Sequence, residues 1–326
     1  MSKKKVLVVG SFVLDQTAIT SVFPNEGETV LGETFSKAPG GKGANQAVQL
    51  GRLGADTTMI GKLGRDANGE DLIGACSSAG VDTSKVLYDD KVASGCAVII
   101  VQRYEGEASR NRILVIPGTN MTIKEEELKF LEDEIEDYSL VVLQLEIPMA
   151  INEYVARIAY EHSVPVLLNP APWDTLSPEL LSHLTFIAPN EYEAKGLTGI
   201  EIAHHGEEYD EAAAQAAADA LHAKGVKNVL ITLGTAGAFL STPERSYHSP
   251  CIMEIKAVDP TAAGDSFIGA FSYGYINGWD YESILVFANH VSALTVSRMG
   301  AMPSIPTYAE VVELLKKRNV KLEVEL

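Results

Sequence analysis

The segment Asp259–Asp265 combines small residues with a carboxylate at the expected start of a helix. Residues 261–264 are small enough to let a ligand approach the backbone, and the free N–H groups of a first helical turn attract an anion. Asp265 stands where a base meets a hydroxyl group beside that anion. Phosphoryl transfer to an alcohol needs this pairing of an anion hole with a carboxylate. Taken alone, the segment fits an ordinary helix start better, because helix caps vastly outnumber active sites.

A second glycine-rich segment, Gly40–Asn45, opens a predicted helix over Ala44–Leu53. Its glycines permit close backbone approach, and Asn45 is able to hydrogen-bond a polar ligand. The alternative is a simple glycine turn with a solvated lysine. The sequence contains no G-x-x-x-x-G-K-[ST] motif, and no G-x-G-x-x-G follows the first predicted strand. These absences disfavour a P-loop and a nicotinamide oxidoreductase.

The elements that must position these segments alternate between apolar runs and amphipathic stretches, which predicts a doubly wound α/β fold. Continuous apolar runs are typical of strands buried on both faces of a parallel sheet. The predicted strands are Val6–Val9, Leu140–Leu145, Val164–Leu168, Phe186–Ala188 and Val229–Leu233. The further predicted helices are Thr122–Glu136, which begins with a capping box, Met149–His162, Asp210–Lys224, Asp265–Tyr275 and Tyr281–Arg298.

Polar residues follow the predicted strands at the points where the strands end. They are Asp15, Glu146, Asn169, the segment Asn190–Glu193 and the segment Thr232–Gly237. Each alone is typical of a cap or a turn. Ligands bind outside the carboxyl ends of the strands in open α/β sheets, so the set together predicts a binding site at that edge.

Two strand-rich segments interrupt the α/β alternation and predict a separate small sheet that acts as a lid. The first covers about residues 15–38, with β-like stretches at Thr29–Leu31 and Glu33–Phe35. The second, residues 95–117, is typical of a hairpin whose strands are Cys96–Gln102 and Arg112–Ile116, with its turn at Glu105–Glu107. The charged hairpin tip is long enough to affect lid closure.

Composition narrows the class of protein. The 326 residues are 46% hydrophobic, which supports a large core, and the net charge of −18 argues against a nucleic-acid partner. Cys76, Cys96 and Cys251 are far apart, as expected of buried thiols in a reducing compartment. The histidines, including the pair at 204–205, show no metal-binding spacing. The first apolar run is far too short for a signal peptide or a membrane span, so we expect a cytoplasmic protein without a membrane partner.

These segments, in this order, resemble the PfkB family of carbohydrate kinases, in particular its ribokinase-like members. The similarity runs from Val6 to about Pro306, and its joint motifs are Gly40–Asn45, Gln144–Glu146, Leu168–Pro172, Pro189–Glu193, Ile231–Gly234 and Asp259–Asp265. The resemblance implies a ribokinase-like three-layer α/β/α sandwich with a mostly parallel central sheet, as one kinase domain over residues 1–326. It also implies a small β-sheet lid from about 12–39 and 95–117, and a homodimer formed through that lid.

The resemblance further implies a role for each matching residue. Asp265 corresponds to the catalytic base, and Ala262, Ala263 and Gly264 correspond to the anion hole. The sugar hydroxyls would be held by Asp15, Gly41, Lys42, Asn45, Glu146 and Asp265. The nucleotide would be bound by Asn190, Thr232, Gly234, Gly237 and Asn289. Asn190 and Glu193 would organise Mg²⁺ and its waters. A K⁺ ion would be bound by the loop that contains Asp259, Thr261, Thr295, Arg298, Gly300 and Ser304.

The implied activity is ATP-dependent phosphorylation of a pentose, and the motifs favour D-ribose at its 5-hydroxyl. Rivals within the class are 2-deoxyribose, fructose-type and nucleoside kinases, and a rival outside it is a non-catalytic sugar-binding protein on the same fold. The segments Gly40–Asn45 and Asn169–Pro172 favour a free pentose over a nucleoside. Val13 departs from the family, because many bacterial members have asparagine at this position, and it leaves the physiological sugar open.

Overall fold

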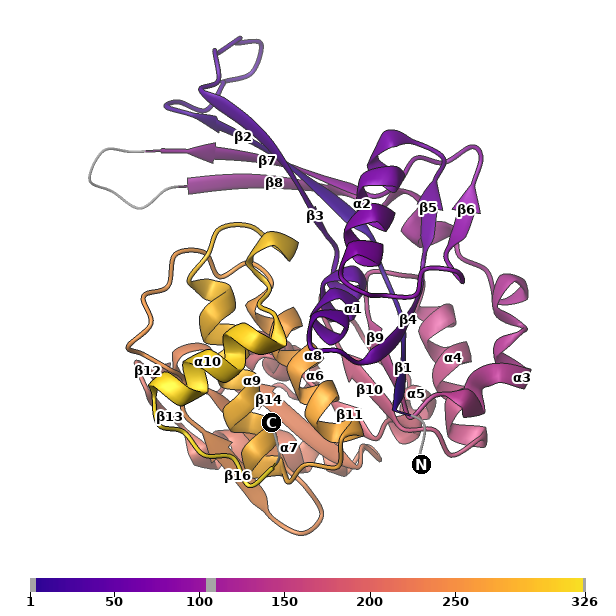
Figure 1. The fold of residues 1–326 in the computed structure, drawn as a ribbon, viewed down its shortest axis with the longest axis vertical. Coiled ribbons are helices and arrows are strands. Elements are labelled where there is room, and N and C mark those ends of the chain that lie inside the picture. The colour runs from indigo at the N-terminus through magenta and orange to yellow at the C-terminus, as the bar shows by residue number, and fades with distance from the viewer. Residues whose placement is uncertain (1–3, 104–109, 325–326) are drawn as a thin grey trace.

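In the computed structural model, which describes residues 4–103 and 110–324, the core is one eight-stranded sheet with the order β16-β15-β14-β11-β10-β9-β1-β4 (Figure 1). The strands from β14 to β4 are parallel, whereas β15 and β16 pair antiparallel. Their bounds are Lys5–Val9 (β1), Asp56–Ile60 (β4), Leu140–Gln144 (β9), Val166–Asn169 (β10), Phe186–Ile187 (β11), Asn228–Thr232 (β14), Ala238–Ser241 (β15) and Ser246–Ser249 (β16). The five predicted strands are confirmed. β4 was not predicted, because two threonines interrupt its apolar pattern.

Helices cover both faces of this sheet and form two apolar layers. Alternate residues of β1 divide between the layers, with Val6 and Val8 in one cluster and Leu7 and Val9 in the other. The first layer is made by α1 (Lys42–Arg52), α2 (Ala67–Ser78), α8 (Ala263–Ile276), α9 (Tyr281–Val296) and α10 (Tyr308–Lys317). The second is made by α3 (Leu131–Glu134), α4 (Met149–Glu161), α5 (Pro178–His183), α6 (Glu191–Thr198) and α7 (Glu211–His222). The predicted three-layer sandwich is therefore confirmed.

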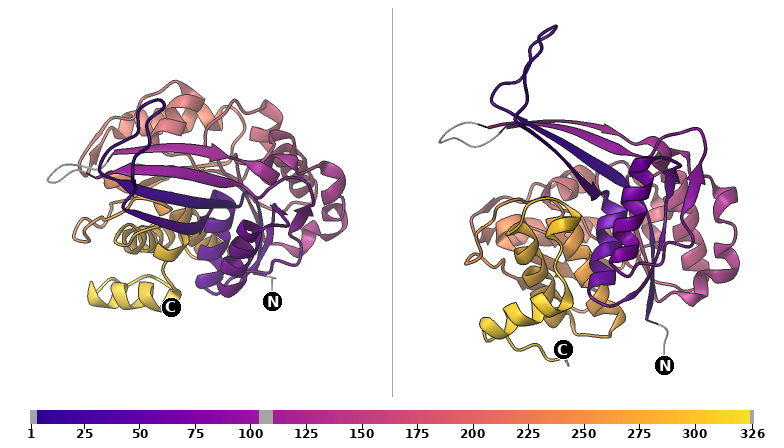
Figure 2. Two further views of the ribbon diagram at one scale, coloured as in Figure 1. Left: turned by 90° about the horizontal axis from the view of Figure 1, so that it is seen from above. Right: turned by 45° about the horizontal axis from the view of Figure 1, so that its top comes forward.

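The lid is a four-stranded sheet that projects from the body (Figures 1 and 2). Its strand order is β3-β2-β7-β8, with bounds Val13–Thr20 (β2), Thr34–Gly40 (β3), Cys96–Gln102 (β7) and Arg110–Ile116 (β8). The central pair β2–β7 is parallel and the outer pairs are antiparallel. The lid segments are where the sequence predicted them, although residues 29–31 form no strand. The predicted turn at 105–107 lies outside the described residues.

The helix predicted over Thr122–Glu136 is wrong. The chain forms a series of short turns there: η1 (Gly118–Thr122), η2 (Glu125–Leu128), α3 and η3 (Ile135–Asp137). Thr122 does not cap a helix, because its hydroxyl donates to the carbonyl of Thr119 at 2.9 Å. Lys124 takes the capping position instead, and its N–H donates to Glu127 at 2.9 Å. Leu128, Leu131 and Ile135 are still buried, so a succession of turns satisfies the same apolar spacing.

The remaining short elements complete the body. They are β5 (Lys62–Gly64), β6 (Leu87–Asp89), β12 (His204–His205), β13 (Glu208–Tyr209), η4 (Gly234–Ala236) and η5 (Met302–Ser304). Across residues 4–103 and 110–324, no helix combines the length and the apolar character needed to cross a bilayer. The expected single domain and cytoplasmic location stay predictions.

Candidate active site

A pocket of about 220 Å³ opens at the carboxyl ends of the parallel strands, beside the starts of α1 and α8. It brings together eight predicted site residues: Lys42, Asn190, Glu193, Thr232, Ala262, Ala263, Gly264 and Asp265. Asn169, Ala171, Ala188, Pro260 and Ile268 complete the lining. Segments far apart in the sequence therefore meet at one edge of the sheet, as we predicted from the polar residues that follow the strands.

The start of α8 is open on its N-terminal side. Ala262 adopts the left-handed conformation with φ of 60°, a backbone geometry that builds anion-binding concavities. The N–H of Ala263 donates to the carbonyl of Pro260 at 3.2 Å. Among the described residues, the N–H groups of Gly264 and Asp265 have no hydrogen-bond partner. These two donors, at the positive end of a 14-residue helix, are therefore free to bind an anion.

The Asp265 carboxylate is buried and held by two carboxamides of α1. Asn45 Nδ2 donates to Asp265 Oδ2 at 2.8 Å, and Gln46 Nε2 donates to Asp265 Oδ1 at 3.1 Å. Asp265 is only 8% exposed, while Asn45 Oδ1 is buried without a partner among the described atoms. The arrangement fixes a carboxylate beside free N–H donors and leaves the Asn45 carbonyl oxygen able to accept a hydrogen bond from a hydroxyl group.

Glycines allow α1 to begin against the turn that follows β1. Gly41 has φ of 94°, and a Cβ there would lie 2.6 Å from the Val13 nitrogen. A Cβ on Gly43 would lie 2.6 Å from the Ser11 nitrogen. Both glycines were predicted to lie at a ligand-binding turn. The structure shows that each also lies close to the backbone of residues 10–13.

Glu146 joins the loop after β9 to the start of α1. Its Oε2 accepts hydrogen bonds from the Ser11 hydroxyl and from the Lys42 N–H, the latter at 3.0 Å. The Lys42 N–H belongs to the first helical turn, where a carboxylate is favoured by the helix dipole. The other oxygen, Oε1, has no hydrogen-bond partner in the part of the chain that the structure describes, so it remains available to a ligand.

Charged groups around the pocket shift one another's protonation. Burial, together with the negative charges of Glu146 and Asp259, raises the pKa of Asp15 in β2 to about 6. Burial opposes the charge on Lys42, but the carboxylates of Asp265, Glu146 and Glu193 outweigh it and raise the Lys42 pKa. Asp15 is therefore a carboxylate that titrates close to neutral pH, and Lys42 stays a cation in the pocket.

Asn190 and Glu193 form a capping box at the start of α6. Asn190 Oδ1 accepts the Glu193 N–H at 2.8 Å, and Glu193 Oε2 accepts the Asn190 N–H at 2.8 Å. Asn190 also forms a bridge with Thr232 at the end of β14. Burial raises the pKa of Glu193, although the Asn190 N–H and Lys42 oppose this effect. The motif is thus both a helix cap and a pocket wall.

Gly237 and Asn289 meet at a neighbouring segment outside the pocket lining. A Cβ on Gly237 would lie 2.1 Å from the Ser249 carbonyl oxygen. Asn289 Nδ2 donates to the Ser249 and Pro250 carbonyls at 2.9 and 3.1 Å. Gly234 lies on the connecting turn η4, between the end of β14 and Gly237. The predicted nucleotide residues therefore form two groups joined by this turn.

The predicted cation loop is organised around Asp259. Its Oδ1 accepts from the N–H and the hydroxyl of Thr261, at 3.0 and 2.6 Å, and its Oδ2 accepts from the Gly300 N–H at 2.8 Å. Burial works against the carboxylate, but these hydrogen bonds lower the pKa of Asp259. Thr295 and Ser304 bond locally, to the carbonyls of Val291 and Ala301. Arg298 pairs with Glu310 at 2.7 Å. Three of the six predicted residues are thus in direct contact.

Two residues of the site, Ser11 and Gln46, were missed by the sequence reasoning. Gln46 follows Asn45 on α1 and is fully buried, yet a buried glutamine on a helix gives no signal of its partner 219 residues away. Ser11 follows the end of β1. It could have been predicted in the same way as the other polar residues that follow strands.

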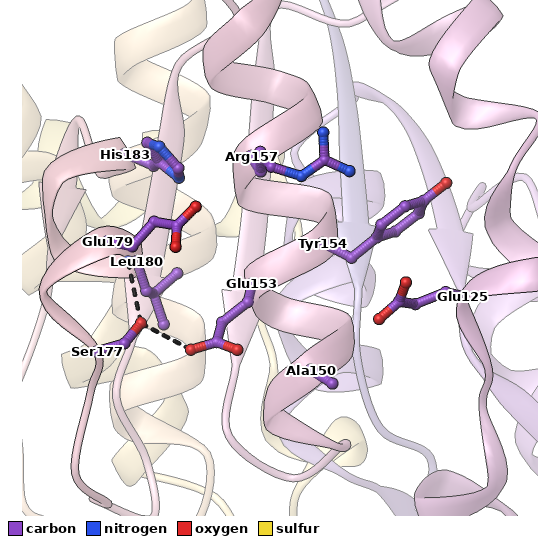
Figure 3. A pocket seen from close by; sticks show the side chains of 9 residues that line it. All are labelled: Glu125, Ala150, Glu153, Tyr154, Arg157, Ser177, Glu179, Leu180 and His183. Carbon is purple, nitrogen blue, oxygen red and sulfur yellow. Dashed lines mark hydrogen bonds between the residues drawn. The ribbon is translucent and has the colours of Figure 1, made fainter.

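A second pocket, between α4 and α5, contains none of the predicted residues (Figure 3). Its volume is about 190 Å³. The Ser177 hydroxyl at the start of α5 donates to Glu153 of α4 at 2.7 Å, and Arg157 pairs with Glu161 at 2.9 Å on the same helix. Within the described residues, no group of three or more His, Cys, Asp or Glu side chains is placed to hold a metal ion.

The fold is that of a ribokinase-type carbohydrate kinase. Residues 3–308 match the model of the pfkB family carbohydrate kinases, and the chain belongs to this family. It is 40% identical to the ribokinase of Schizosaccharomyces pombe over 94% of this chain and 96% of the relative. It is 33% identical to the deoxyribokinase of Salmonella typhimurium over 95% and 98% of the two chains. The structure of Arabidopsis thaliana ribokinase complexed with ribose and ATP superimposes with a TM-score of 0.87, at 32% identity over 97% and 99% of the chains.

Proposed function

We propose that this kinase transfers the γ-phosphoryl group of ATP to the 5-hydroxyl of D-ribose, with Asp265 as the base. The observation that carries the proposal is the buried Asp265 carboxylate beside the free N–H groups of Gly264 and Asp265. The carboxylate accepts the proton of the attacking hydroxyl, and the N–H donors stabilise charge on the transferring group. Because the Ala263 N–H is engaged by Pro260, we assign the anion hole to Gly264 and Asp265, in addition to the open turn at Ala262.

The sugar is assigned to the region between the start of α1, Glu146 and the lid. Three acceptors there are free among the described atoms: Glu146 Oε1, Asn45 Oδ1 and the carboxylate of Asp15. Carboxylate and amide oxygens accept hydrogen bonds from sugar hydroxyls. Gly41 keeps the backbone open to the ligand, and the Lys42 ammonium group counters the negative charge that ATP brings.

ATP is assigned to the outer part of the same pocket. Asn190 and Thr232 line it, and η4 with Gly234 leads to Gly237 and Asn289. The structure of the Arabidopsis relative complexed with ribose and ATP supports binding of both substrates on this fold.

Mg²⁺ fits the donors around Glu193. This carboxylate lines the pocket and is 8% exposed. Among the described residues, only its Oε2 has a hydrogen-bond partner, the Asn190 N–H. Mg²⁺ binds one or two carboxylates and keeps waters and substrate phosphates as its other ligands. Asn190 and Glu193 would hold it through water, and the bound ion would neutralise charge on the phosphates. Glu193 is itself fixed by the capping box, which orients its carboxylate toward the pocket residues.

K⁺ fits the loop around Asp259. The Asp259 carboxylate supplies a fixed negative charge, because its hydrogen bonds lower its pKa and keep it ionised. The carbonyl oxygens of Thr261 and Gly300 accept no hydrogen bond within the described residues. Backbone carbonyls are hard oxygen donors suited to such a cation. The assigned loop includes Asp259, Thr261, Thr295, Arg298, Gly300 and Ser304, and a bound ion would steady the turn that precedes α8.

The closest competing substrate is 2-deoxyribose. Val13 is 7% exposed at the base of the lid, next to Gly41, and it offers no side-chain hydrogen bond to a hydroxyl group. A deoxyribokinase is also among the relatives. Fructose-type and nucleoside substrates follow as weaker candidates. A non-catalytic sugar-binding role is disfavoured because Asp265, Asn190 and Glu193 are all retained.

We also assign a homodimer formed through the lid. The edge strand β8 exposes Ile113, Leu114 and Val115, with exposed fractions of 57%, 64% and 56%. An uncovered apolar edge strand is a template for a second chain, and another lid would cover it. Leu114→Glu should convert a dimer to a monomer in light scattering, while Met121→Glu, an exposed site outside the lid, should not.

A panel of sugars tests the proposed substrate. ATP consumption is measured with ribose, 2-deoxyribose, fructose, arabinose and adenosine, in Mg²⁺ with either K⁺ or Na⁺. We expect the largest kcat/KM with ribose and stimulation by K⁺. A preference for 2-deoxyribose would overturn the assignment of ribose as the substrate and indicate Val13 as the cause of the changed specificity. Sugar binding without ATP consumption for every sugar would overturn the kinase assignment of the pocket.

A further inference from the structure

We propose that Gln46 is a positioning residue that holds the Asp265 carboxylate in its reactive orientation. The inference rests on the proposed role of Asp265 as the base. Each carboxylate oxygen receives one amide N–H, Oδ2 from Asn45 and Oδ1 from Gln46. Neither amide lines the pocket, but Asn45 is assigned to the sugar in our proposal, whereas Gln46 is fully buried. Its effect on the reaction therefore passes through Asp265.

The orientation of the Gln46 amide is dictated by a chain of hydrogen bonds that begins at the backbone. The Ala188 carbonyl can only accept, so the Asn169 nitrogen must face it, at 2.9 Å. Asn169 Oδ1 then faces Gln46 and requires a donor, which is Gln46 Nε2 at 3.2 Å. The Gln46 amide nitrogen is therefore the group that points at both Asn169 and Asp265.

The opposite end of the Gln46 amide is fixed as well. Its Oε1 accepts from Gln144 Nε2 at 2.7 Å, at the end of β9. Gly10 makes room for this contact, since a Cβ there would lie 2.0 Å from Gln144 Oε1. The ends of three parallel strands thus orient one glutamine, and through it the carboxylate on α8.

Gln46 would act on Asp265 as the third group of a catalytic triad acts on its base, by fixing the orientation of the base. A carboxylate held by two donors keeps its remaining lone pairs aimed at one place, and small misplacements of a catalytic group are costly. Loss of the Gln46 donor frees Oδ1 to rotate and leaves it less stabilised as an anion. A carboxylate that loses a donated hydrogen bond binds a proton more readily.

The test compares Gln46→Leu and Gln46→Glu with Gln49→Leu as a matched control. Gln49 lies one turn later on α1, is equally buried and donates to the Pro306 carbonyl at 3.2 Å. We expect Gln46→Leu to lower kcat at least about 10-fold, to leave both KM values within about 2-fold, and to move the acid limb of the kcat pH profile upward. Gln49→Leu should lower the melting temperature similarly without moving the pH profile.

Gln46→Glu keeps the shape of the side chain, so it answers the question if Gln46→Leu does not fold. It places a second carboxyl group beside Asp265, and we expect a larger upward shift of the acid limb. An unchanged kcat and pH profile in a folded Gln46 variant would overturn the proposal. Asp265→Asn, assayed in parallel, separates the two ideas: an active Asp265→Asn variant overturns the base itself, whereas an inactive one with a normal Gln46→Leu overturns only the positioning role.

Discussion

Two pockets of similar size, about 220 and 190 Å³, differ in how deeply their carboxylates are buried. In the pocket beside α1 and α8, the carboxylates of Asp265 and Glu193 are each 8% exposed. Asp265 is held by Asn45 and Gln46 of α1, and Glu193 is held by the N-cap of its own helix. In the pocket between α4 and α5, Glu179 is exposed, and Glu153 and Arg157 are only half-buried (Figure 3). Glu153 accepts from Ser177 at the start of α5, and Arg157 pairs with Glu161 on α4. Buried carboxylates in fixed orientations, rather than volume, therefore distinguish the proposed active site from the second pocket.

The largest expected effect comes from removing the base. Asp265→Asn keeps the shape and the contact with Gln46 but cannot accept the hydroxyl proton, so kcat should fall about 100-fold or more while ATP affinity is kept. Steady-state ATP consumption and nucleotide titration measure the two quantities. The matched control in the other pocket, Glu153→Gln, should keep kcat within about 2-fold. Near-normal turnover by Asp265→Asn would remove this residue as the base.

A smaller effect concerns Asp15 and pH. The Asp15 pKa of about 6 means that the carboxylate is protonated at pH 5 and ionised at pH 8. If it accepts sugar hydroxyls, the KM for sugar should rise about 10-fold as the pH falls through 6. This rise should be absent in Asp15→Asn. A wild-type KM for sugar that does not change between pH 5 and pH 8 would show that Asp15 takes no part in sugar binding.

The same pKa makes a prediction about stability. Because the folded-state pKa of Asp15 lies above its ordinary value, folding favours the protonated form. Its contribution to stability is therefore full below about pH 4 and is lost as the pH rises through 6. Asp15→Asn should raise the melting temperature at pH 8 and leave it nearly unchanged at pH 4. An equal shift at both pH values would show that the effect comes from packing instead.

The packing beneath the active pocket can be tested with a pair of glycines. Gly43→Ala should destabilise by about 1–3 kcal/mol, because its Cβ would lie 2.6 Å from the backbone of Ser11. Gly74 on α2 has nothing within 4 Å of an added Cβ. Gly74→Ala should therefore stabilise by roughly 0.5–1 kcal/mol through helix propensity. Denaturant unfolding measures both, and equal effects would contradict the close approach of α1 to residues 10–13.

The smallest effect on activity is expected in the second pocket. Ser177 caps α5 by accepting the Leu180 N–H at 3.2 Å. Ser177→Ala should cost about 1 kcal/mol of stability through the lost cap. Its kcat and both KM values should remain within about 2-fold of the wild type. A tenfold loss of turnover would give this pocket a role in the reaction.

The sequence predicted most of the parts of the site but not their mutual contacts. Glycine segments, strand ends and the Asn190–Glu193 spacing are local signals, and each is where it was expected. The bond from Gln46 to Asp265 joins residues 219 positions apart, and spacing along the chain holds no record of it. For the same reason Asn45 was assigned to the sugar alone, although its amide nitrogen also holds Asp265.

Errors in the fold prediction also have local causes. The Thr122–Glu136 stretch has helical apolar spacing, yet short turns bury the same leucines and place the cap at Lys124. Strand β4 was missed because Thr57 and Thr58 interrupt its apolar run, although both are buried in the sheet. Tertiary burial decides such segments, and local propensity does not report it.

Backbone hydrogen exchange tests most directly which pocket binds the substrates. The free N–H groups of Gly264 and Asp265 should exchange readily without ligand and become protected when a non-hydrolysable ATP analogue and ribose are added. Peptides covering residues 41–46 and 232–237 should also gain protection, while residues 150–157 and 177–183 should not change. Protection confined to the α4–α5 pocket, with none at 262–266, would contradict the account.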